Sequence, residues 1–439
     1  MLKSANLFKN RKILIYGFGK SGKASFKYLC KNNYLKIFDD NNLAVKKNLK
    51  KFFLKRKFLR SINFDFIVIS PGIDINKCSL KKYLLNNKDK IINELDIFYL
   101  NNIKNCKITI TGTNGKSTTS KLLYEVIKSH NKDVRLVGNI GKPLLLERNI
   151  NPHTIFVIEA SSYQIEYSRF FRTNYSMILN ISRDHLERHG SFKNYIKSKL
   201  KLIENQHTDG YALIDENPYL NKELKKNKLN TKIKKINTNL SKYFRKKIIN
   251  LNFENLNNLK NLQFILEISK ILNLREKKIL DIVNSFKGLK FRQQIIYESK
   301  KFTLINDSKA TSYSSSINIL KSLKKVYWIV GGVPKVGDKF LMYKNQCLNI
   351  KAYIFGRNKN FFIKELRNKV KYEHFKDLKQ ALKKIVLDIK LKKKEKKHQT
   401  ILFSPSAASF DSYRNFEDRG EKFNQIIKKL NFKKIINAR

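Results

Sequence analysis

The sequence predicts an α/β protein of three domains, and three observations lead to this prediction. Short apolar runs without polar alternation recur along the chain, as expected of strands that are buried on both faces. Stretches with a helical pattern, such as 116–128 and 194–203, separate many of these runs, and strand–helix alternation is typical of parallel sheets. The length of 439 residues fits several domains of roughly 100–200 residues each.

The apolar runs and the sequence between them indicate where the domains divide. One boundary is expected where Asn- and Lys-rich sequence separates two units that each join a strand to a glycine loop. The other is expected after a helical stretch that precedes a further strand. The expected domains are 1–95, 96–288 and 289–439. Residues 218–262 are too rich in Lys and Asn to interpret, and either a folded lobe or an irregular surface is compatible with them. The predicted strands are 13–16, 66–70, 108–111, 155–158, 177–179, 211–214, 302–305, 326–330, 352–355 and 401–403.

The charge of the chain has two interpretations. The 92 Lys and Arg residues against 35 Asp and Glu residues give a net charge of +57, which on its own favours a nucleic-acid binder. However, the lysines are spread along the chain, and Lys, Asn, Ile, Phe and Tyr share A/T-rich codons. A biased genome therefore explains the whole composition, and we expect no specific nucleic-acid partner.

The cysteines and the apolar runs indicate the compartment. Cys30, Cys78, Cys106 and Cys347 lie far apart without a CxxC pair, which argues against a zinc ribbon or a disulfide framework and suits a reducing cytoplasm. No run approaches 18 apolar residues, so no membrane insertion is expected. We expect a cytoplasmic protein, and a monomer.

A glycine loop between a predicted strand and a predicted helix is the strongest functional signal. The sequence TGTNGKSTT covers 111–119, with the strand 108–111 before it. Such a loop presents backbone N–H groups and a helix N-terminus to phosphate oxygens. Lys116 would reach the outer phosphates and the Ser117 hydroxyl would bind Mg²⁺. The general P-loop has a glycine where this chain has Ile110, so only the shorter variant of the motif is intact. We predict ATP binding.

A second glycine loop follows the first predicted strand. Residues 17–22 read GFGKSG, which fits GxGxxG, and Asp39 and Asp40 follow a second strand. By itself this pattern is typical of a Rossmann dinucleotide site. The N-terminal domain is therefore expected to be Rossmann-like, although GxGxxG alone is weak evidence for NAD.

Polar clusters follow two further strands of the central region. Glu159 comes directly after the strand 155–158, and the sequence NISRDH at 180–185 follows the next strand. The carboxyl ends of parallel strands face the crevice where α/β proteins bind ligands. Glu159 and His185 are therefore candidates to contact a metal ion or phosphate.

Three polar loops follow strands in the last third of the chain. They are NDSKAT at 306–311, GGVPK at 331–335 and SPSAASFD at 404–411. Loops at the carboxyl ends of several strands form the expected rim of a ligand crevice.

Together these motifs resemble the Mur ligases, the ATP-dependent amide-forming enzymes of peptidoglycan precursor assembly. The resemblance rests on TGTNGKSTT, EASSYQ at 159–164, NDSKAT and SPSAASFDSYRNFEDRG at 404–420, and it runs from Gly17 to Gly420. It implies a Rossmann-like N-terminal domain, a central P-loop ATPase-like domain and a Rossmann-like C-terminal domain. Within the family, the combination looks like the branch that adds D-glutamate to UDP-N-acetylmuramoyl-L-alanine.

The resemblance implies a role for each matching residue. The residues implied to act in catalysis are Lys116, Glu159, His185 and Lys199, and those implied to hold Mg²⁺ are Ser117, Glu159, His185 and Lys199. The residues implied to bind ATP are Gly112, Thr113, Asn114, Gly115, Lys116, Ser117, Thr118, Asn258, Arg292, Asp307 and Lys309. Those implied to bind the UDP substrate are Lys20, Ser21, Asp39, Asp40, Ser70, Asn139, Ser161 and Gln164. Those implied to bind D-glutamate are Thr311, Lys335, Ser409, Phe410 and Phe416.

The lysine that Mur ligases carbamylate is chosen here by alignment on Glu204, which selects Lys199. The residues alone do not choose among Lys197, Lys199 and Lys201, which all lie on the predicted helix. A carbamate would turn this cation into a metal ligand that resembles a carboxylate.

The sequence departs from the family pattern at two places on the adenine side. The motif usually written GxHNxxN reads NLNNLKN at 255–261, with Asn255 and Asn257 at the Gly and His positions. The motif GLxHR reads GLKFR at 288–292, with Phe291 at the His position. These departures bear on nucleotide affinity more than on the reaction.

Three alternatives remain open at this stage. A sister Mur ligase would add another amino acid or a dipeptide, although the Asn-Pro-Arg motif frequent in the diamino-acid enzyme does not occur. An NAD-dependent oxidoreductase would leave TGTNGKST unexplained. An inactive nucleic-acid binder would be expected to lack Lys116, Ser117, Glu159 and His185, which are all present.

Overall fold

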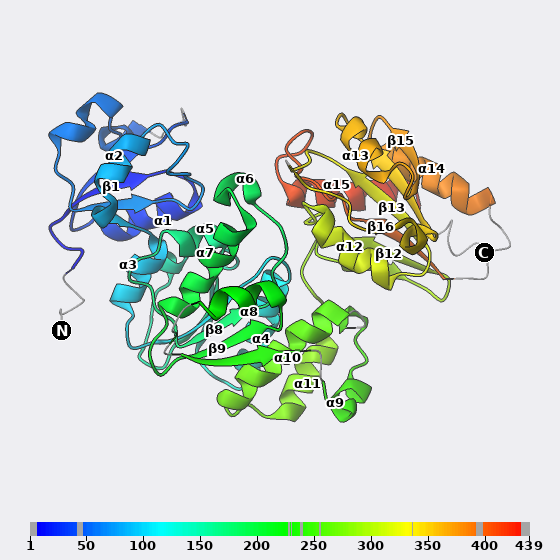
Figure 1. Cartoon of the computed structure of the whole chain (residues 1–439), viewed down its shortest axis with the longest axis horizontal. Helices are drawn as coiled ribbons and strands as arrows, with labels where there is room; N and C mark the ends of the chain where they lie inside the picture. Colours follow the sequence, from blue (N-terminus) through cyan, green and yellow to red (C-terminus); the bar gives the residue numbers. More distant parts are fainter. Residues whose placement is uncertain are drawn as a thin grey trace. The chain divides into compact units, whose positions relative to one another are not determined.

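The computed structural model of the chain describes residues 7–41, 47–226, 229, 231–237, 240–253, 256–335, 337–391 and 398–431. Asn255, one of the two departures in the NLNNLKN motif, lies outside these residues. Three sheets, each built from its own stretch of the chain, organise the described residues (Figure 1). The predicted α/β class is confirmed.

The first sheet is parallel and has the strand order β2-β1-β3-β4. Its strands β1 and β3 are the predicted runs at 13–16 and 66–70, and the side chains from Ile13 to Tyr16 are fully buried. The elements are β1 (Lys12–Tyr16), α1 (Lys20–Leu29), β2 (Tyr34–Phe38), η2 (Lys47–Phe52), η3 (Arg56–Ser61), β3 (Phe66–Ile69), α2 (Lys81–Asn86), η4 (Lys88–Lys90), β4 (Ile91–Ile92) and α3 (Glu94–Asn101).

The second sheet is parallel, with the order β10-β9-β8-β5-β7-β6. Its strands are β5 (Cys106–Thr111), β6 (Val134–Gly138), β7 (Ile155–Glu159), β8 (Tyr175–Ile178), β9 (Tyr211–Asp215) and β10 (Lys232–Ile236). Its helices are α4 (Lys116–Ser129), η5 (Leu144–Leu146), α5 (Ser162–Glu166), α6 (Leu186–His189), α7 (Phe192–Glu204), α8 (Pro218–Leu224), α9 (Lys242–Lys247), η6 (Leu251–Phe253), α10 (Leu256–Ile271) and α11 (Glu276–Ser285). The stretch 218–262, which the sequence left open, contributes α8, β10, α9 and the start of α10. Strand β10 was not predicted because it is an edge strand on which only Ile236 is buried.

The third sheet has the order β11-β12-β16-β13-β14-β15, and every pair except the first is parallel. Strand β11 runs antiparallel to β12, with a register shift between Ile295 and Tyr297. The elements are β11 (Gln294–Glu298), β12 (Phe302–Asn306), α12 (Tyr313–Ser322), β13 (Val326–Gly331), η7 (Lys344–Cys347), β14 (Ile350–Phe355), α13 (Lys359–Leu366), β15 (Lys371–Phe375), α14 (Leu378–Leu391), β16 (Gln399–Phe403) and α15 (Phe416–Lys429).

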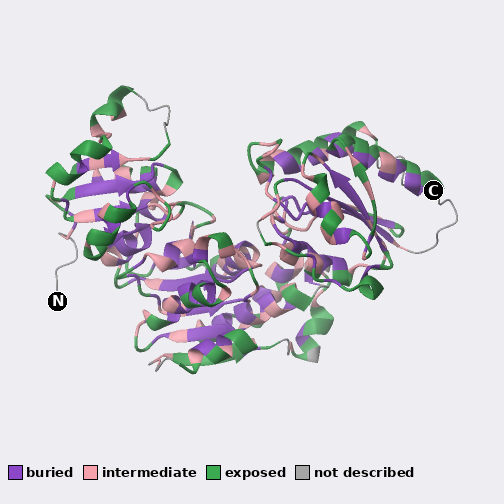
Figure 2. Ribbon diagram, turned by 45° about the horizontal axis from the view of Figure 1, so that its top comes forward, coloured by how far each residue is buried: buried purple, intermediate pink, exposed green. Residues whose placement is uncertain are grey.

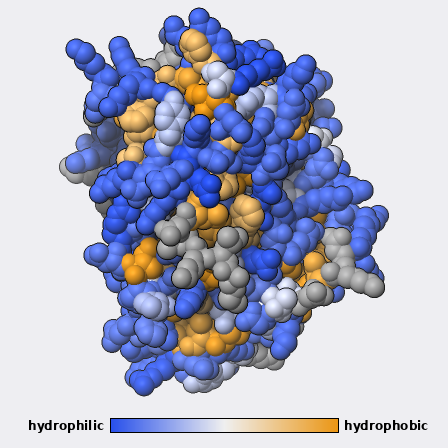
Figure 3. All heavy atoms as spheres, turned by 90° about the vertical axis from the view of Figure 1, so that its left-hand side faces the viewer, coloured by the Kyte–Doolittle hydropathy of each residue, from blue (hydrophilic) through white to orange (hydrophobic). Residues whose placement is uncertain are grey.

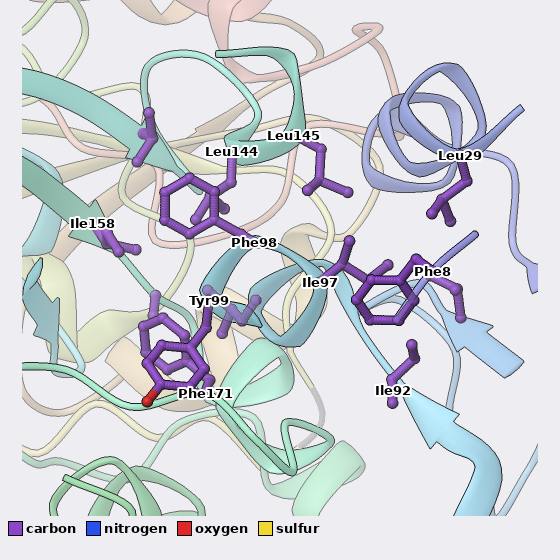
Figure 4. Packing of buried hydrophobic residues seen from close by; sticks show 14 of the residues in the cluster. Phe8, Leu29, Ile92, Ile97, Phe98, Tyr99, Leu144, Leu145, Ile158 and Phe171 are labelled. Carbon is purple, nitrogen blue, oxygen red and sulfur yellow. The ribbon is translucent and has the colours of Figure 1, made fainter. Parts of the chain in front are cut away.

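The described chain forms two compact units. The first contains residues 1–181, 188–249 and 259–285, and therefore both the first and the second sheet; the second contains 182–187, 250–258 and the residues from Phe286 onward. Helix α3 connects the two sheets of the first unit, because Ile97 points toward Phe8 while Tyr99 lies against Phe171 (Figure 4). The expected boundary between 95 and 96 falls inside this helix. We keep the division at 1–95, 96–288 and 289–439 as a proposal, since each part carries one sheet.

Burial follows the sheets. The central strands of all three sheets are buried, and the helices bury one side and expose the other (Figure 2). The face drawn in Figure 3 is mostly hydrophilic, with small and separate hydrophobic areas. All four cysteines are free thiols. No helix among the described residues combines the length and apolarity needed to span a bilayer.

Asp96, in the first turn of α3, is a fully buried carboxylate that holds a loop of the second sheet. Its Oδ1 accepts hydrogen bonds from the backbone N–H groups of Arg169, Phe170 and Phe171 at 2.8–2.9 Å. Its Oδ2 accepts the N–H of Asn93 at 3.1 Å and completes a capping box. Burial raises the pKa of Asp96 to about 6, although these four donors favour the ionised form.

We expect Asp96→Ala to lower the free energy of unfolding by about 3 kcal/mol, because four backbone N–H groups, those of Asn93 and Phe171 in buried positions, lose their acceptor. Chemical denaturation of the whole chain measures this change. Asp89→Ala is the control, since Asp89 is an exposed carboxylate in the same part of the chain. The control should change stability by less than about 0.5 kcal/mol. Equal effects of the two substitutions would contradict the role of Asp96.

Candidate functional site

The phosphate-type loop lies between β5 and α4, as the sequence predicts. Gly112 and Gly115 have φ values of 149° and 80°, which a residue with a side chain rarely adopts. A Cβ on Gly115 would lie 2.5 Å from Nδ2 of Asn261, so this glycine also lets a neighbouring side chain approach the backbone. Helix α4 begins at Lys116, which places the positive end of its dipole at the loop.

Asn180 fixes the conformation of this loop. It follows β8, the strand beside β5 in the sheet, by two residues. Its Oδ1 accepts the N–H of Asn114 at 2.8 Å, and its Nδ2 donates to the Asn114 carbonyl at 2.9 Å. Its backbone carbonyl accepts the N–H of Thr113 at 3.0 Å. Lys116 Nζ donates to the carbonyls of Gly112 and Thr113 at 2.8 Å each, so the cation lies over the loop where a phosphate would bind.

Glu159 ends strand β7, which neighbours β5 in the sheet, and its side chain is 1% exposed. Oε1 accepts the Asn139 amide at 2.7 Å. Oε2 is buried without a hydrogen-bond partner among the described residues. Because a buried carboxylate oxygen without a donor is costly, this atom points to a cation as its missing partner.

The donors at this edge fit Mg²⁺. Magnesium is usually held by one or two carboxylates together with phosphate oxygens and waters, and Ser117, which is 2% exposed, adds a hydroxyl in the first turn of α4. No group of three His, Cys, Asp or Glu side chains in the described part of the chain forms a metal cluster.

The structure distinguishes the three lysines of α7. Lys197 is exposed, and Lys201 donates to the carbonyl of Glu166 at 2.8 Å. Lys199 is 1% exposed, and its Nζ lies 3.0 Å from the Gly112 carbonyl and 3.3 Å from Oγ1 of Thr111. Of the three, Lys199 is thus the one placed against the phosphate-type loop.

His185 lies in the segment 182–187, which groups with the second unit. Its φ of 55° is left-handed, and its ring nitrogens lie 3.4 Å from Asp184 and 3.6 Å from Glu187. A role for His185 beside Glu159 therefore stays a prediction.

A pocket of about 480 Å³ lies at the carboxyl edge of the first sheet. Most residues expected to bind the UDP substrate line it, together with Cys78. Those expected residues and their neighbours are Gly17, Gly19, Lys20, Ser21, Asp39, Asp40, Ser70, Pro71 and Gly72.

Several polar groups of this pocket already have partners inside the chain. Asp39 accepts the N–H of Phe18 at 2.6 Å, and Asp40 accepts the Tyr16 hydroxyl at 2.5 Å. The Ser21 hydroxyl donates to Glu94 at 2.6 Å. Asp39, Asp40 and Ser21 therefore also shape the pocket.

Three residues expected at the UDP substrate do not line this pocket. Asn139 bonds Glu159, as described above, and so belongs to the edge of the second sheet. Ser161 and Gln164 form the capping box at the start of α5. Their contact with a UDP substrate stays a prediction.

The third sheet carries a polar rim at its carboxyl edge. Asp307, after β12, is buried; its Oδ2 accepts the Ser404 hydroxyl at 2.8 Å and its Oδ1 accepts the N–H of Gln293 at 3.1 Å. Burial raises the pKa of Asp307 to about 7. Lys309 Nζ lies 4.0 Å from the centre of the Phe416 ring, so a residue expected at ATP contacts one expected at D-glutamate.

The other residues expected to bind D-glutamate differ in how far they are exposed. Ser409 is buried and Thr311 is half-buried, whereas Phe410 is 76% exposed. Lys335 is half-buried and its Nζ lies 2.5 Å from Asp184 Oδ1. Because an ammonium group has three N–H donors, this bond leaves donors for a carboxylate ligand.

Residues of the two adenine-side motifs make contacts inside the second unit. Asn258, which keeps the family pattern, lies on α10 and donates to the Asn252 carbonyl at 2.6 Å, whereas Phe291 is a departure from the pattern. Phe291 is buried with φ at 62°, a strained value for a bulky residue, and its ring fills the space beside Gly420. Arg292, next in the chain, closes the turn by donating its N–H to Leu289.

Two asparagines contact the phosphate-type loop although the sequence analysis gave them no role: Asn180, which opens NISRDH at 180–185, and Asn261, which closes NLNNLKN at 255–261. Asn180 clamps the loop, and Asn261 lies against Gly115. Asn180 could have been found as the first polar residue after a buried strand, beside a loop that needs hydrogen-bond partners. Asn261 comes from a helix far along the chain, and no local pattern indicates that contact.

Comparison with known proteins agrees with this geometry. A family model described as "Mur ligase middle domain" matches residues 110–275. A protein of Rickettsia prowazekii (strain Madrid E) named UDP-N-acetylmuramoylalanine--D-glutamate ligase is 32% identical over 452 residues, covering 97% of this chain and 99% of the relative. A protein of the same name from Francisella tularensis subsp. novicida (strain U112) is 32% identical over 441 residues, covering 96% and 97%.

Solved structures share the fold. MurF from Acinetobacter baumannii superimposes with a TM-score of 0.61 at 13% identity, covering 98% of this chain and 93% of that one. MurF ligase from Thermotoga maritima, solved in complex with ADP, gives a TM-score of 0.58 at 15% identity, with 98% and 97% covered. Since relatives at about a third identity align along nearly its entire length, the chain belongs to the Mur ligase family.

Proposed function

We propose that this chain is an ATP-dependent ligase that joins D-glutamate to UDP-N-acetylmuramoyl-L-alanine in peptidoglycan precursor synthesis. The observation that carries the proposal is the edge of the second sheet, where the phosphate-type loop, Glu159 and the buried Lys199 meet. The names of the full-length relatives support the choice of substrates. Release of phosphate that depends on both UDP-N-acetylmuramoyl-L-alanine and D-glutamate is the test.

The chemical problem is that a carboxylate does not accept an amine at neutral pH. Transfer of the γ-phosphoryl group of ATP to the alanyl carboxylate gives an acyl phosphate and ADP. The amine of D-glutamate then attacks the acyl carbon, loses a proton, and phosphate leaves as the amide forms. Positioning and charge stabilisation are the main contributions that a protein makes to such phosphoryl transfer.

The residues at the loop supply those contributions. The backbone N–H groups of the loop and the cation of Lys116 would hold the phosphates and offset the charge that develops on the transferred group. Ser117, Glu159, His185 and the carbamate of Lys199 are the proposed holders of Mg²⁺. When bound there, Mg²⁺ supplies positive charge beside the phosphate oxygens.

The position of Lys199 supports its carbamylation. Its Nζ lies against the phosphate-type loop, and the neutral amine is the form of lysine that reacts with CO₂. The Nζ lone pair forms an N–C bond to CO₂, one N–H proton is released, and a carbamate anion results. This anion would stand beside Gly112 and supply the oxygen ligands that Mg²⁺ prefers.

The remaining substrates have proposed sites on the other two sheets. The 480 Å³ pocket of the first sheet would take the UDP group, with the start of α1 at its phosphates. The rim of the third sheet would take D-glutamate, through Thr311, Lys335, Ser409, Phe410 and Phe416, and would share the nucleotide through Asn258, Arg292, Asp307 and Lys309. We propose a monomer that works in the cytoplasm, where its four free thiols stay reduced.

We expect Lys116→Ala to lower kcat on the order of 100- to 1,000-fold, because the substitution removes a cation that touches the transferred phosphoryl group. Steady-state phosphate release with both substrates measures this loss. Lys128→Ala, an exposed lysine on the same helix, is the matched control and should keep wild-type turnover. Wild-type activity in Lys116→Ala would overturn the ATP site.

We expect Lys199→Ala to lose activity that acetate or formate partly restores, because a small carboxylate can replace the carbamate oxygens. Lys197→Ala, two residues away on the exposed side of α7, should stay active and show no rescue. Independently of activity, ¹³C-labelled bicarbonate should give a carbamate signal by NMR in the wild type and none in Lys199→Ala. A signal that persists in Lys199→Ala would place the carbamate elsewhere.

We expect the enzyme to prefer D-glutamate over L-glutamate and D-aspartate by on the order of 100-fold in kcat/KM, because inversion of the α-carbon or shortening of the side chain displaces either the amine or a carboxylate by about 1 Å.

We expect Lys335→Ala to raise the KM for D-glutamate at least about tenfold, which corresponds to roughly 1.4 kcal/mol of binding. The exposed Lys339→Ala is the control. Comparable turnover with L-alanine or a diamino acid would assign the chain to a sister ligase.

A further inference from the structure

Arg419 is a buried cation at the start of helix α15 that the proposed reaction does not use. Its side chain is fully buried, which is rare for arginine. Burial lowers the pKa of Arg419 to about 10, so the guanidinium still carries its charge at neutral pH. A charge kept inside a protein needs compensation, and the hydrogen bonds of this residue show where that compensation comes from.

The guanidinium binds two separate loops. Nη2 donates to the carbonyls of Ser308 and Ala407 at 2.8 and 2.9 Å, and Nη1 donates to the Ala408 carbonyl at 3.2 Å. Nε donates to the Ser308 hydroxyl at 3.2 Å. Ser308 follows β12, whereas Ala407 and Ala408 follow β16. A planar group with donors in fixed directions therefore joins the ends of two neighbouring strands.

A third loop is added through backbone pairing. Val333, after β13, exchanges two hydrogen bonds of 2.8 Å with Ala408. A Cβ on Gly332 would lie 2.4 Å from the Ala408 carbonyl and 2.9 Å from Nη1 of Arg419. Only glycine fits at this place, so the loop after β13 packs directly on the guanidinium. The strands β12, β16 and β13 are adjacent in the sheet.

These three loops carry the residues assigned above to the amino-acid substrate. Thr311 follows Ser308 by three residues, Lys335 follows Val333 by two, and Ser409 is next to Ala408. The Ser308 hydroxyl also donates to the carbonyl of Phe416 at 2.8 Å, which ties the start of α15 to the same cluster.

We propose that Arg419 is a positioning residue that sets the mutual register of the three loops forming the D-glutamate site. This inference rests on the proposed function and deepens it. Arg419 touches the carbonyls behind the site and acts through Ser308, Ala408 and Gly332. A displacement of about 1 Å between loops that grip one small substrate can cost on the order of 100-fold.

The test compares Arg419→Lys with two other variants of the full-length enzyme. Lysine keeps the positive charge but lacks the planar group with donors in fixed directions, so this variant should release the relative position of the three loops without removing the cation. Ser308→Ala is a milder variant that removes one acceptor of the fork and the bond to Phe416. Asp388→Asn is the control, because Asp388 is also buried in this unit but bonds Lys351, Lys384 and Tyr353 away from the three loops.

We expect the KM for D-glutamate to rise at least about tenfold in Arg419→Lys and less in Ser308→Ala, with the KM for UDP-N-acetylmuramoyl-L-alanine within about twofold of wild type. Asp388→Asn should lower the melting temperature and leave both KM values unchanged. A purely structural Arg419 would lower only the fraction of active enzyme, and an unchanged KM for D-glutamate would overturn the proposal.

Hydrogen–deuterium exchange tests whether Arg419 positions the three loops, without a measurement of enzyme activity. In Arg419→Lys the amides of 306–311, 331–335 and 404–409 should exchange faster together, whereas Asp388→Asn should affect β14 and α14. Faster exchange in only one of the three loops would overturn the proposal. If the wild type itself shows no turnover that depends on D-glutamate, the proposed function fails, and exchange alone then judges the role of Arg419.

Discussion

Parallel pairing of strands is the constraint on which the rest of this structure depends. A chain that leaves one parallel strand must cross back through a helix or loop before it enters the next, so all loops that follow the strands collect at one edge of the sheet. The three sheets obey this constraint, apart from the antiparallel edge strand β11. The pocket at the first sheet, the phosphate-type loop at the second and the polar rim at the third all lie at such an edge.

Buried polar side chains hold loops of the second and third sheets in place through backbone groups. Asn180 pairs with both backbone groups of Asn114, and Asp96 accepts three successive N–H groups after α5. Arg419 also holds loops in place, but as a cation that donates hydrogen bonds to backbone carbonyls. Loops have few backbone partners of their own, so each buried polar side chain that binds them removes an unsatisfied group and fixes one conformation.

The sequence predicts the sheets and the loops well, because both leave local patterns. The predicted strands at 13–16 and 108–111 are confirmed by β1 and β5, since a strand buried on both faces is a continuous apolar run. Strands β4, β6, β10, β11 and β15 were missed, and all five lie at sheet edges. Partly exposed positions interrupt the apolar pattern in four of them, and β4 has only two residues. The contact between Gly115 and Asn261 joins residues about 150 positions apart in the sequence, so no local signal carries it. The three lysines of α7 could not be ranked from the sequence, because their burial depends on where the helix packs.

The excess of basic residues explains how the buried cations are compensated. With 92 Lys and Arg against 35 Asp and Glu, most cations have no acid available. The fully buried Lys107 donates to the carbonyls of Asn102, Ile103 and Asn105, and Arg419 likewise binds carbonyls and a hydroxyl. A carbonyl dipole offsets only part of a full charge, which is consistent with the lowered pKa values of about 8 for Lys107 and about 10 for Arg419. Asp411 and Asp307 also stabilise the charge of Arg419 electrostatically, whereas its hydrogen bonds go to carbonyls and a hydroxyl of the loops. The contacts that compensate this buried cation are therefore the same contacts that hold the loops after β12 and β16 together.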